Sequence, residues 1–298
     1  MEKNIRAIMG QYDIRPVKSL GQNFLISSQV KKKIIEAAAI QKDDMVIEIG
    51  AGMGVLSKEI ANKAGRFAVI EIDKHLIPVL EETLKDYRNV KIINKDILKL
   101  DIQNDIILRT IDEGEEFVPA CIKVVGNLPY YITTPIIMKL LEDNPGVDEI
   151  IFMIQKEVAD RIMAKPGTKD YGALSVVVQY YSYPRILFNV SPSSFMPKPK
   201  VYSSVIRLRI HKIPPVKVVD KDMFFKIIKA SFGQRRKTLL NALFNANLFS
   251  FNKEKIKSIL KETGIEESVR GETLSISQFA QLSDEFFKAA NSNNYSKP

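Results

Sequence analysis

Short apolar runs alternate with mixed polar and apolar segments over the first two thirds of the chain. The runs lie at residues 45–49, 67–72, 90–93, 121–125 and 149–155. Between them, residues 57–62 and 75–86 have the pattern of helices with one apolar face. Apolar strands that alternate with helices form mostly parallel sheets covered on both faces. We therefore predict an α/β fold.

The pattern changes after about residue 180. Residues 185–190 and 203–210 have the pattern of strands, separated by a proline-rich loop at 191–200, and suit antiparallel positions at the end of the sheet. A linker-like stretch follows at 211–215. Helices are expected beyond it, at 222–230, 234–246, 253–262 and 277–290, before a polar tail at 291–298. We therefore predict two domains, 1–211 and 212–298.

The charge balance favours a polyanionic partner. The 298 residues include 44 Lys and Arg against 35 Asp and Glu, for a net charge of +9. The densest runs are Lys31, Lys32 and Lys33, in a helix that Ser28 could cap, and Arg235, Arg236 and Lys237, in a helix expected to begin just after Gly233. We predict that both runs contact nucleic-acid phosphates, although a solvated helix face explains such runs equally well.

Several classes of protein and site have little support. The one cysteine, Cys121, lies in an apolar run, so we expect a small core residue rather than a nucleophile, and no disulfide. No signal peptide is evident, and no apolar run approaches the roughly 18 residues of a membrane span. His75 and His211 have no cysteines near them, so no metal site is expected. We expect a cytoplasmic protein.

A glycine-rich turn follows the first apolar strand. Gly50, Gly52 and Gly54 follow Glu48 with the spacing E-x-G-x-G-x-G, whereas dinucleotide-binding turns read G-x-G-x-x-G/A. Val55 stands where the latter pattern requires Gly or Ala. The spacing is similar to the turn that binds S-adenosylmethionine (SAM), a cofactor without a pyrophosphate. The alternative is a purely structural glycine turn.

Two acidic residues after the next strands are candidate ligands of an adenosine. Glu71 ends the second strand, where a carboxylate can accept hydrogen bonds from both ribose hydroxyls. Asp73 is better placed to cap the helix that starts near His75. Asp96 follows the third strand and could accept from the adenine amine, although a solvated loop residue is the alternative.

The fourth strand runs into the tetrapeptide Asn127-Leu128-Pro129-Tyr130, which carries the most specific signal because it resembles the N-L-P-Y or D/N-P-P-Y/F motif of amino-group methyltransferases. An exocyclic amine is a poor nucleophile because its lone pair is delocalised into the ring. The Asn127 side-chain oxygen and the Leu128 carbonyl can accept its two N–H groups, which favours a pyramidal nitrogen. Pro129 fixes the turn, and Tyr130 offers a flat face to an extruded base. We predict transfer of a methyl group to an amine. The alternative is a strand-ending turn beside a core tyrosine.

A second aromatic residue, Phe195, lies in the proline-rich loop. It could cover the other face of the extruded base, with Lys198 and Lys200 near backbone phosphates. The alternative is a surface loop anchored by a buried phenylalanine.

Collectively these residues identify a resemblance. The chain resembles the bacterial rRNA adenine N6,N6-dimethyltransferases, specifically the small-subunit class, over nearly its whole length. The stretches that carry it are 18–25, 48–54, 69–73, 126–135, 155–159, 171–175, the Phe195 loop, 229–232 and 235–239. The resemblance implies a Rossmann-like class I SAM-dependent methyltransferase sheet with a small helical C-terminal domain that binds rRNA. It also implies that SAM is contacted by Asn23, Leu25, Gly50, Glu71, Asp96 and Asn127.

The same resemblance implies the product and the partner. They are N6,N6-dimethyladenosine at two adjacent adenosines near the 3′ end of 16S rRNA, and the assembling small ribosomal subunit. A monomer suits a protein that docks on such a large particle. The acidic stretch 109–119 has no functional explanation.

Three other interpretations are open from the sequence. A large-subunit rRNA methyltransferase of the macrolide-resistance type has the same chemistry, but Leu128 and residues 132–135 favour the small-subunit class. A non-catalytic ribosome-assembly factor is disfavoured by the full set of cofactor and tetrapeptide residues, Gly50, Gly52, Glu71 and Asn127. A nicotinamide dehydrogenase is disfavoured by Val55.

Overall fold

The computed structural model describes residues 2–111, 117–143, 145–248 and 251–292. The chain divides into two compact units. The first comprises residues 1–159 and 183–210, and the second comprises 160–182 and 211–298. In the part that the structure describes, no helix combines the length and the apolar character needed to cross a membrane.

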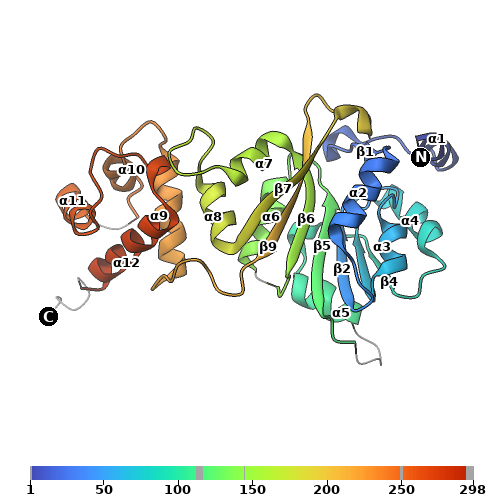
Figure 1. Ribbon diagram of the computed structural model, residues 1–298, viewed down its shortest axis with the longest axis horizontal. Helices are drawn as coiled ribbons and strands as arrows, with labels where there is room; N and C mark the ends of the chain where they lie inside the picture. The colour runs from blue at the N-terminus through green and yellow to red at the C-terminus, as the bar shows by residue number, and fades with distance from the viewer. Residues whose placement is uncertain (1, 112–116, 144, 249–250, 293–298) are drawn as a thin grey trace. The chain divides into compact units, whose positions relative to one another are not determined.

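A seven-stranded sheet forms the centre of the first unit (Figure 1). Its strand order is β4-β3-β2-β5-β6-β9-β7. The strands are β2 (Asp44–Ile49), β3 (Arg66–Ile70), β4 (Val90–Ile93), β5 (Cys121–Asn127), β6 (Glu149–Gln155), β7 (Ser182–Val190) and β9 (Ser203–Ile210). The first five in this order are parallel, and β9 is antiparallel to β6. The predicted α/β fold is confirmed. The strand order reverses between β2 and β5, where ligands bind in such sheets.

Helices cover the sheet on both faces, as Figure 1 shows. Apolar side chains of α2 (Ser28–Ala38), α3 (Ser57–Lys63) and α4 (Ile77–Leu84) pack in one core cluster with β2, β3 and β5. Helix α6 (Thr133–Glu142) lies on the other face and contacts η3 (Ile97–Lys99), while α5 (Arg109–Ile111) contacts η4 (Ile102–Leu108). The strands are buried on both faces, which explains their nearly continuous apolar sequences.

The N-terminal segment lies beside the carboxyl ends of the strands. It contains α1 (Glu2–Gln11), η1 (Lys18–Leu20) and β1 (Phe24–Leu25). The short strand β1 pairs antiparallel with β8 (Phe195–Met196), which follows η5 (Pro192–Ser194). Ile5, Ile14 and Phe24 pack with Leu76 and Val79 of the η2–α4 region in a small separate core, where η2 is Lys74–Leu76. This packing holds residues 20–25 over the strand ends.

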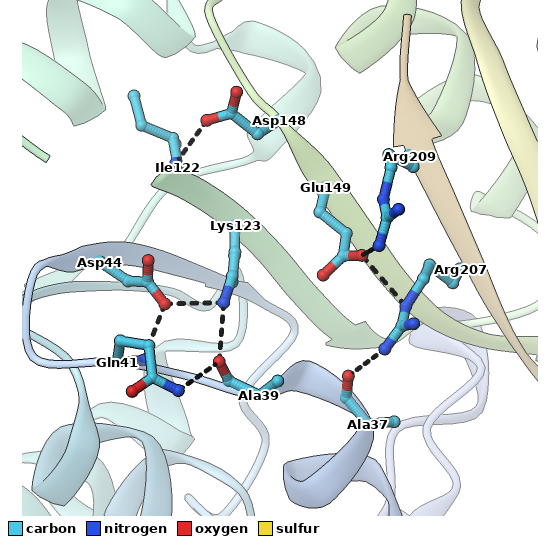
Figure 2. Close-up of polar contacts among 10 residues, drawn as sticks. All are labelled: Ala37, Ala39, Gln41, Asp44, Ile122, Lys123, Asp148, Glu149, Arg207 and Arg209. Carbon is cyan, nitrogen blue, oxygen red and sulfur yellow. Dashed lines mark hydrogen bonds and ion pairs between the residues drawn. The ribbon is translucent and has the colours of Figure 1, made fainter. Parts of the chain in front are cut away.

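Two ion pairs anchor the C-terminal end of α2 to the amino ends of the strands (Figure 2). Lys123 of β5 contacts Asp44 at 2.7 Å and donates to the Ala39 carbonyl at 2.9 Å. Arg207 of β9 contacts Glu149 at 3.1 Å and donates to the Ala37 carbonyl. Both cations thus satisfy carbonyl groups at a helix C-terminus, where positive charge is favourable.

The second unit is helical. It contains part of α7 (Lys156–Met163), then α8 (Ala173–Tyr181), α9 (Lys221–Gly233), α10 (Leu239–Asn245), α11 (Lys253–Glu262), η6 (Gly271–Thr273) and α12 (Ile276–Ser292). Tyr171, Val176 and Tyr180 belong to the same core cluster as Phe224 and Phe279. The units therefore differ from the predicted division of 1–211 and 212–298, because residues 160–182 belong with the C-terminal helices.

Other local differences have physical causes. The helix expected at 234–246 begins only at Leu239, because Thr238 caps it by accepting from the Asn241 N–H. The cap of α2 is Ser27 rather than Ser28, since Ser27 accepts from Val30 N–H. Within the stretch 109–119, residues 112–116 lie outside the described residues, as do 293–298 of the polar tail.

Candidate functional site

A cavity opens at the carboxyl ends of β2, β3 and β5. Its volume is about 1050 Å³, including space open to solvent. Its lining comes from the roof at residues 20–25, the turn after β2, the ends of β3 and β5, and residues 95–97. Of the predicted cofactor ligands it brings together Asn23, Leu25, Gly50, Gly52, Glu71, Asp96 and Asn127. Residues separated by about a hundred positions in sequence thus share one site.

The turn after β2 requires glycine because its backbone adopts positive φ values. Gly50, Gly52 and Gly54 have φ values of +72°, +60° and +74°. Side chains other than glycine are strained in this region. A Cβ at Gly52 would also lie 3.4 Å from the Phe24 ring in the roof, so the turn and the roof approach closely.

The Glu71 carboxylate is buried and fixed by backbone groups. It is 5% exposed. Its two oxygens accept from Gly52 N–H at 2.8 Å and Asp73 N–H at 2.9 Å. Burial raises the pKa of Glu71, while these two hydrogen bonds act in the opposite direction. Each oxygen can still accept a second hydrogen bond, as recognition of the two hydroxyls of a ribose requires.

Asp73 and Asp96 both accept from backbone groups near the site. Asp73 accepts from His75 N–H and begins η2, as predicted. Asp96 lines the cavity and accepts from Leu98 N–H at 3.0 Å through one oxygen, so its other oxygen is available as an acceptor.

Asn127 ends β5 with its carboxamide in a defined orientation. Its Nδ2 donates to the Asn23 carbonyl at 3.0 Å. Asn23 is itself held by a bond from its Nδ2 to the Gly21 carbonyl. Because the amide nitrogen is engaged with the roof, the Oδ1 of Asn127 remains as an acceptor for an incoming N–H group.

The rest of the tetrapeptide is rigid. The Leu128 N–H donates to the Met153 carbonyl at 3.2 Å, and Thr133 Oγ1 donates to the Pro129 carbonyl at 3.1 Å. The Tyr130 hydroxyl lies 2.8 Å from the Ser203 hydroxyl, and burial raises its pKa. The ring of Tyr130 lines the cavity beside Pro129.

Phe195 does not line the cavity. It is 3% exposed and packs in the core with Leu25, its partner in the β1–β8 pair. Lys198 and Lys200, in the following loop, are exposed. The structure therefore places Phe195 one strand away from the cavity lining, and its predicted contact with a base stays a prediction.

Neither basic run contributes a residue to the cavity lining. Lys31 pairs with Glu59 at 2.8 Å, Lys32 pairs with Glu36 at 3.7 Å, and the Lys33 ammonium lies 5.6 Å from the Phe188 ring centroid. Arg235, Arg236 and Lys237 form a turn between α9 and α10, so their predicted placement in a helix is wrong. Arg235 pairs with Glu272 at 3.1 Å and donates to the Lys169 carbonyl.

Two site features were missed by the sequence reasoning. A Cβ at Gly126 would lie 2.6 Å from the Ile49 carbonyl, so glycine is required directly before the tetrapeptide that Asn127 begins. Gln22 donates to Asp73 at 2.7 Å and accepts from Val17 N–H, which ties the roof to the loop after β3. A glycine inside an apolar strand was the available signal for the first. Nothing local indicated the second.

Comparison with known proteins gives a consistent result. A family model described as ribosomal RNA adenine dimethylase matches residues 15–287. A "Ribosomal RNA small subunit methyltransferase A" of Alkaliphilus metalliredigens (strain QYMF) is 50% identical over 280 residues, covering 94% of this chain and 95% of the relative. The protein of that name from Clostridioides difficile (strain 630) is 48% identical over 279 residues, covering 94% and 93%.

Solved structures show the same fold. A dimethyladenosine transferase from Plasmodium falciparum has a TM-score of 0.72 at 26% identity, covering 89% of this chain and 98% of the other. The 23S rRNA methyltransferase ErmE has a TM-score of 0.62 at 24% identity, covering 88% and 99%. The second likeness shows the fold alone.

Proposed function

Because the chain belongs to the ribosomal RNA adenine dimethylase family, we propose that it dimethylates N6 of two adjacent adenosines near the 3′ end of 16S rRNA during small-subunit biogenesis. It is an rRNA adenine dimethyltransferase that uses SAM. The observation that carries the proposal is the Asn127 carboxamide, whose nitrogen is bound to the roof while its oxygen remains to accept from an amine.

The cavity fits SAM on its own chemistry. Glu71 presents a buried carboxylate suited to a ribose diol, and Asp96 lines the cavity where it can accept from an adenine amine. The turn at Gly50 and Gly52 admits close approach of a ligand to the backbone. Asn23 and Leu25, in the roof at residues 20–25, line the opposite side of the cavity from the strand ends. When bound, SAM supplies a methyl group that its sulfonium has already activated.

The tetrapeptide prepares the nucleophile. In the proposed reaction, Asn127 Oδ1 and the Leu128 carbonyl accept from the two N–H groups of adenine N6. These contacts favour a pyramidal nitrogen and stabilise the positive charge that develops on it. The nitrogen–carbon bond forms, the sulfur–carbon bond breaks, and the amino proton leaves to solvent. No basic side chain is needed because the attacked carbon carries a good leaving group.

The adenine itself needs a stacking surface, and Tyr130 is placed to supply it. We propose that Pro129 holds this ring and that Phe195 approaches the opposite face when RNA binds. Lys198 and Lys200 would then lie near phosphates, as would Lys31, Lys32 and Lys33 and the turn of Arg235, Arg236 and Lys237. Their exposure or half-exposure and the net charge of +9 support this assignment.

The substrate is rRNA, and the small subunit is the proposed particle. The relatives from Alkaliphilus metalliredigens and Clostridioides difficile bear small-subunit names, which favours 16S rRNA over the large-subunit alternative. We propose a monomer, because a single copy of the site suffices for a particle of that size.

The test uses particles from cells that lack the enzyme. Small subunits and large subunits are incubated separately with the protein and SAM, and the rRNA nucleosides are analysed by mass spectrometry. Dimethyladenosine should form in 16S rRNA. Asn127→Ala should bind the particle but transfer at least about a hundredfold more slowly. Methylation of large-subunit rRNA, or full activity of the Asn127→Ala variant, would refute the proposal.

A further inference from the structure

Two buried carboxyl groups line the same cavity from neighbouring strands. Glu48 of β2 is 2% exposed and Glu71, after β3, is 5% exposed. Among the described residues that line the cavity, the one Lys or Arg is Lys95, whose side chain is exposed. Two buried negative charges without a buried cation are costly, so one of these carboxyls is neutral in the free protein.

Glu48 is the group that holds the proton. Glu71 accepts two backbone N–H bonds that stabilise its charge, whereas Glu48 contacts the Ser57 hydroxyl at 2.5 Å. Burial raises the pKa of Glu48, the hydrogen bond with Ser57 lowers it, and the charge of Glu71 raises it, which together place the pKa at about 8. At neutral pH, Glu48 is therefore mostly protonated.

The one buried cation on an adjoining element that the structure describes, Lys123 of β5, is already paired with Asp44 at 2.7 Å. The other charged or titratable residues on the adjoining elements are Lys58, Glu59 and Lys63 on α3, Glu71 and Asp73 after β3, Lys95 and Asp96 after β4, and Tyr130 after β5. Of these, the buried ones are Glu71 and Asp73, and both are acidic. The first buried positive charge in the cavity is thus that of a ligand.

We propose that Glu48 couples a proton to the charge of the cofactor, so that the cavity distinguishes SAM from its demethylated product, S-adenosylhomocysteine (SAH). This inference rests on the proposed function. SAM carries one more positive charge than SAH because its sulfur is a sulfonium. When SAM enters, the Glu48 carboxyl releases its proton to solvent and becomes an anion that stabilises the cation.

Methyl transfer then reverses the proton movement at Glu48. The sulfonium becomes a neutral thioether, the amino nitrogen of adenine loses its proton to solvent, and the Glu48 carboxylate takes a proton from solvent. The net release per methyl group is the one proton from the amine. SAH therefore lacks the charge contact that held SAM, which promotes its exchange for a second SAM before the second transfer.

The coupling has a defined dependence on pH. The free energy needed to ionise Glu48 when SAM binds becomes smaller as the pH rises toward the pKa of about 8. The affinity for SAM should rise by up to about tenfold per pH unit below that value and then level off. The affinity for SAH should change much less, so the ratio of the two affinities should grow with pH.

The experiment is calorimetric titration of SAM, SAH and sinefungin, which bears an ammonium in place of the sulfonium, from about pH 6 to about pH 9. The wild type should show a SAM-to-SAH affinity ratio that rises with pH, and sinefungin should behave as SAM does. Glu48→Gln keeps the shape but cannot ionise, so its ratio should be independent of pH. The amino group of the ligand titrates equally in both variants and cancels in the comparison.

Glu82→Gln, which removes an exposed carboxylate of α4 paired with Lys85, is the matched control and should retain the wild-type slope. A wild-type ratio that is constant with pH, or an equal slope in Glu48→Gln, would overturn the inference while leaving the proposed function intact. If Glu48→Gln does not fold, titrations of the wild type in buffers of different ionisation enthalpy count the protons directly. Equal counts for SAM and SAH would then overturn it. Failure of every ligand to bind would overturn the proposed function itself.

Discussion

The Asn127 carboxamide has a donor nitrogen and an acceptor oxygen, and the fold uses the two atoms differently. Its nitrogen donates to the Asn23 carbonyl at 3.0 Å, which leaves its oxygen as the acceptor for the proposed amine substrate. The sequence identified Asn127 because a carboxamide before Leu-Pro-Tyr is typical of amine methylation. It could not identify the partner, since Asn23 lies about a hundred positions earlier and reaches it only through the folded roof.

The ring of Tyr130 is the proposed stacking surface, whereas its hydroxyl contacts Ser203. Two substitutions should therefore distinguish the contribution of the ring from that of the hydroxyl. Tyr130→Ala removes the ring, and we expect an increase in KM for RNA of about tenfold to a hundredfold, since base stacking contributes about 1–3 kcal/mol. Tyr130→Phe loses the contact with Ser203 but keeps the ring, so KM should change little. Steady-state kinetics on rRNA check both. An unchanged KM in the alanine variant would contradict the stacking role.

Gly126 should tolerate no side chain. A Cβ there would lie 2.6 Å from the Ile49 carbonyl and 3.2 Å from a Leu128 methyl. We expect Gly126→Ala to lower the free energy of unfolding by about 1–3 kcal/mol and to reduce kcat by about a hundredfold through displacement of Asn127. Gly10→Ala, where a Cβ meets nothing within 4 Å, is the matched control. Urea denaturation and transfer assays measure both effects, and equal behaviour of the two variants would refute the expectation.

Glu48 should also make stability depend on pH. Its pKa is raised from 4.5 to about 8 in the folded protein. The folded state therefore binds the proton more tightly than the unfolded state, so this stabilisation is complete below about pH 4.5 and is lost as the pH rises toward 8. The loss is at most about 1.4 kcal/mol per pH unit.

Glu48→Gln lacks this group, so its stability relative to the wild type should increase between about pH 5 and about pH 8. Chemical denaturation at several pH values measures the difference. A difference that is constant with pH would show that Glu48 does not titrate in this range.

At the scale of elements, two cations from the sheet anchor the C-terminal end of α2. Figure 2 shows Lys123 and Arg207 reaching the carbonyls of Ala39 and Ala37 from two different strands. The same helix follows the roof that carries Asn23. Its position on the sheet therefore contributes to the position of the roof.

Lys123→Met should be strongly destabilising. Asp44 is 3% exposed and would keep a buried charge without its cation. We expect a loss of about 3–5 kcal/mol in the free energy of unfolding, partly recovered by adding Asp44→Asn. Lys32→Met breaks the exposed pair with Glu36 at 3.7 Å and should cost less than about 1 kcal/mol. Urea denaturation compares them, and similar losses would contradict the anchoring role of Lys123.

The turn at residues 234–238 shows how a capping residue determines where a helix begins. The pattern around Arg235, Arg236 and Lys237 suits a helix, but α9 ends at Gly233 and Thr238 starts α10. A cap at Thr238 satisfies the Asn241 N–H, which an uninterrupted helix would have bonded to Lys237. The three cations are therefore presented on a turn.

At the scale of the whole molecule, the net charge and the division into units bear on the proposed binding of RNA. The net charge of +9 predicts a salt-dependent affinity. The helical unit takes residues 160–182 from the middle of the chain, so its core is assembled from two distant stretches. A boundary placed near residue 212 from the sequence pattern detects only the last of the three points where the chain passes between the units.

The turn between α9 and α10 should contribute to the salt dependence. In the double variant Arg235→Gln, Arg236→Gln, the slope of log affinity against log salt should become shallower by about 1.5. The double variant Lys257→Gln, Lys288→Gln removes the same charge from residues paired with Glu267 and Glu285 and should leave the slope unchanged. Filter binding of rRNA at several salt concentrations measures both. An unchanged slope in the first variant would exclude phosphate contacts by these arginines.

The sequence by itself determined the residue types of the site and the class of the fold. Strands buried on both faces must be apolar, tight turns need glycine, and methylation of an amine needs acceptors, so each leaves a local pattern. Gly50, Glu71, Asp96 and Asn127 were all found in this way and do line one cavity.

Only the tertiary structure decided what depends on neighbours distant in the chain. The orientation of Asn127, the burial of Phe195 against Leu25 and the steric need for Gly126 each involve contacts across strands. The protonation of Glu48 also depends on residues that are distant in the chain. A carboxyl before a glycine turn has no unusual affinity for protons in sequence, and acquires one because folding removes water from it and places Glu71 in the same cavity.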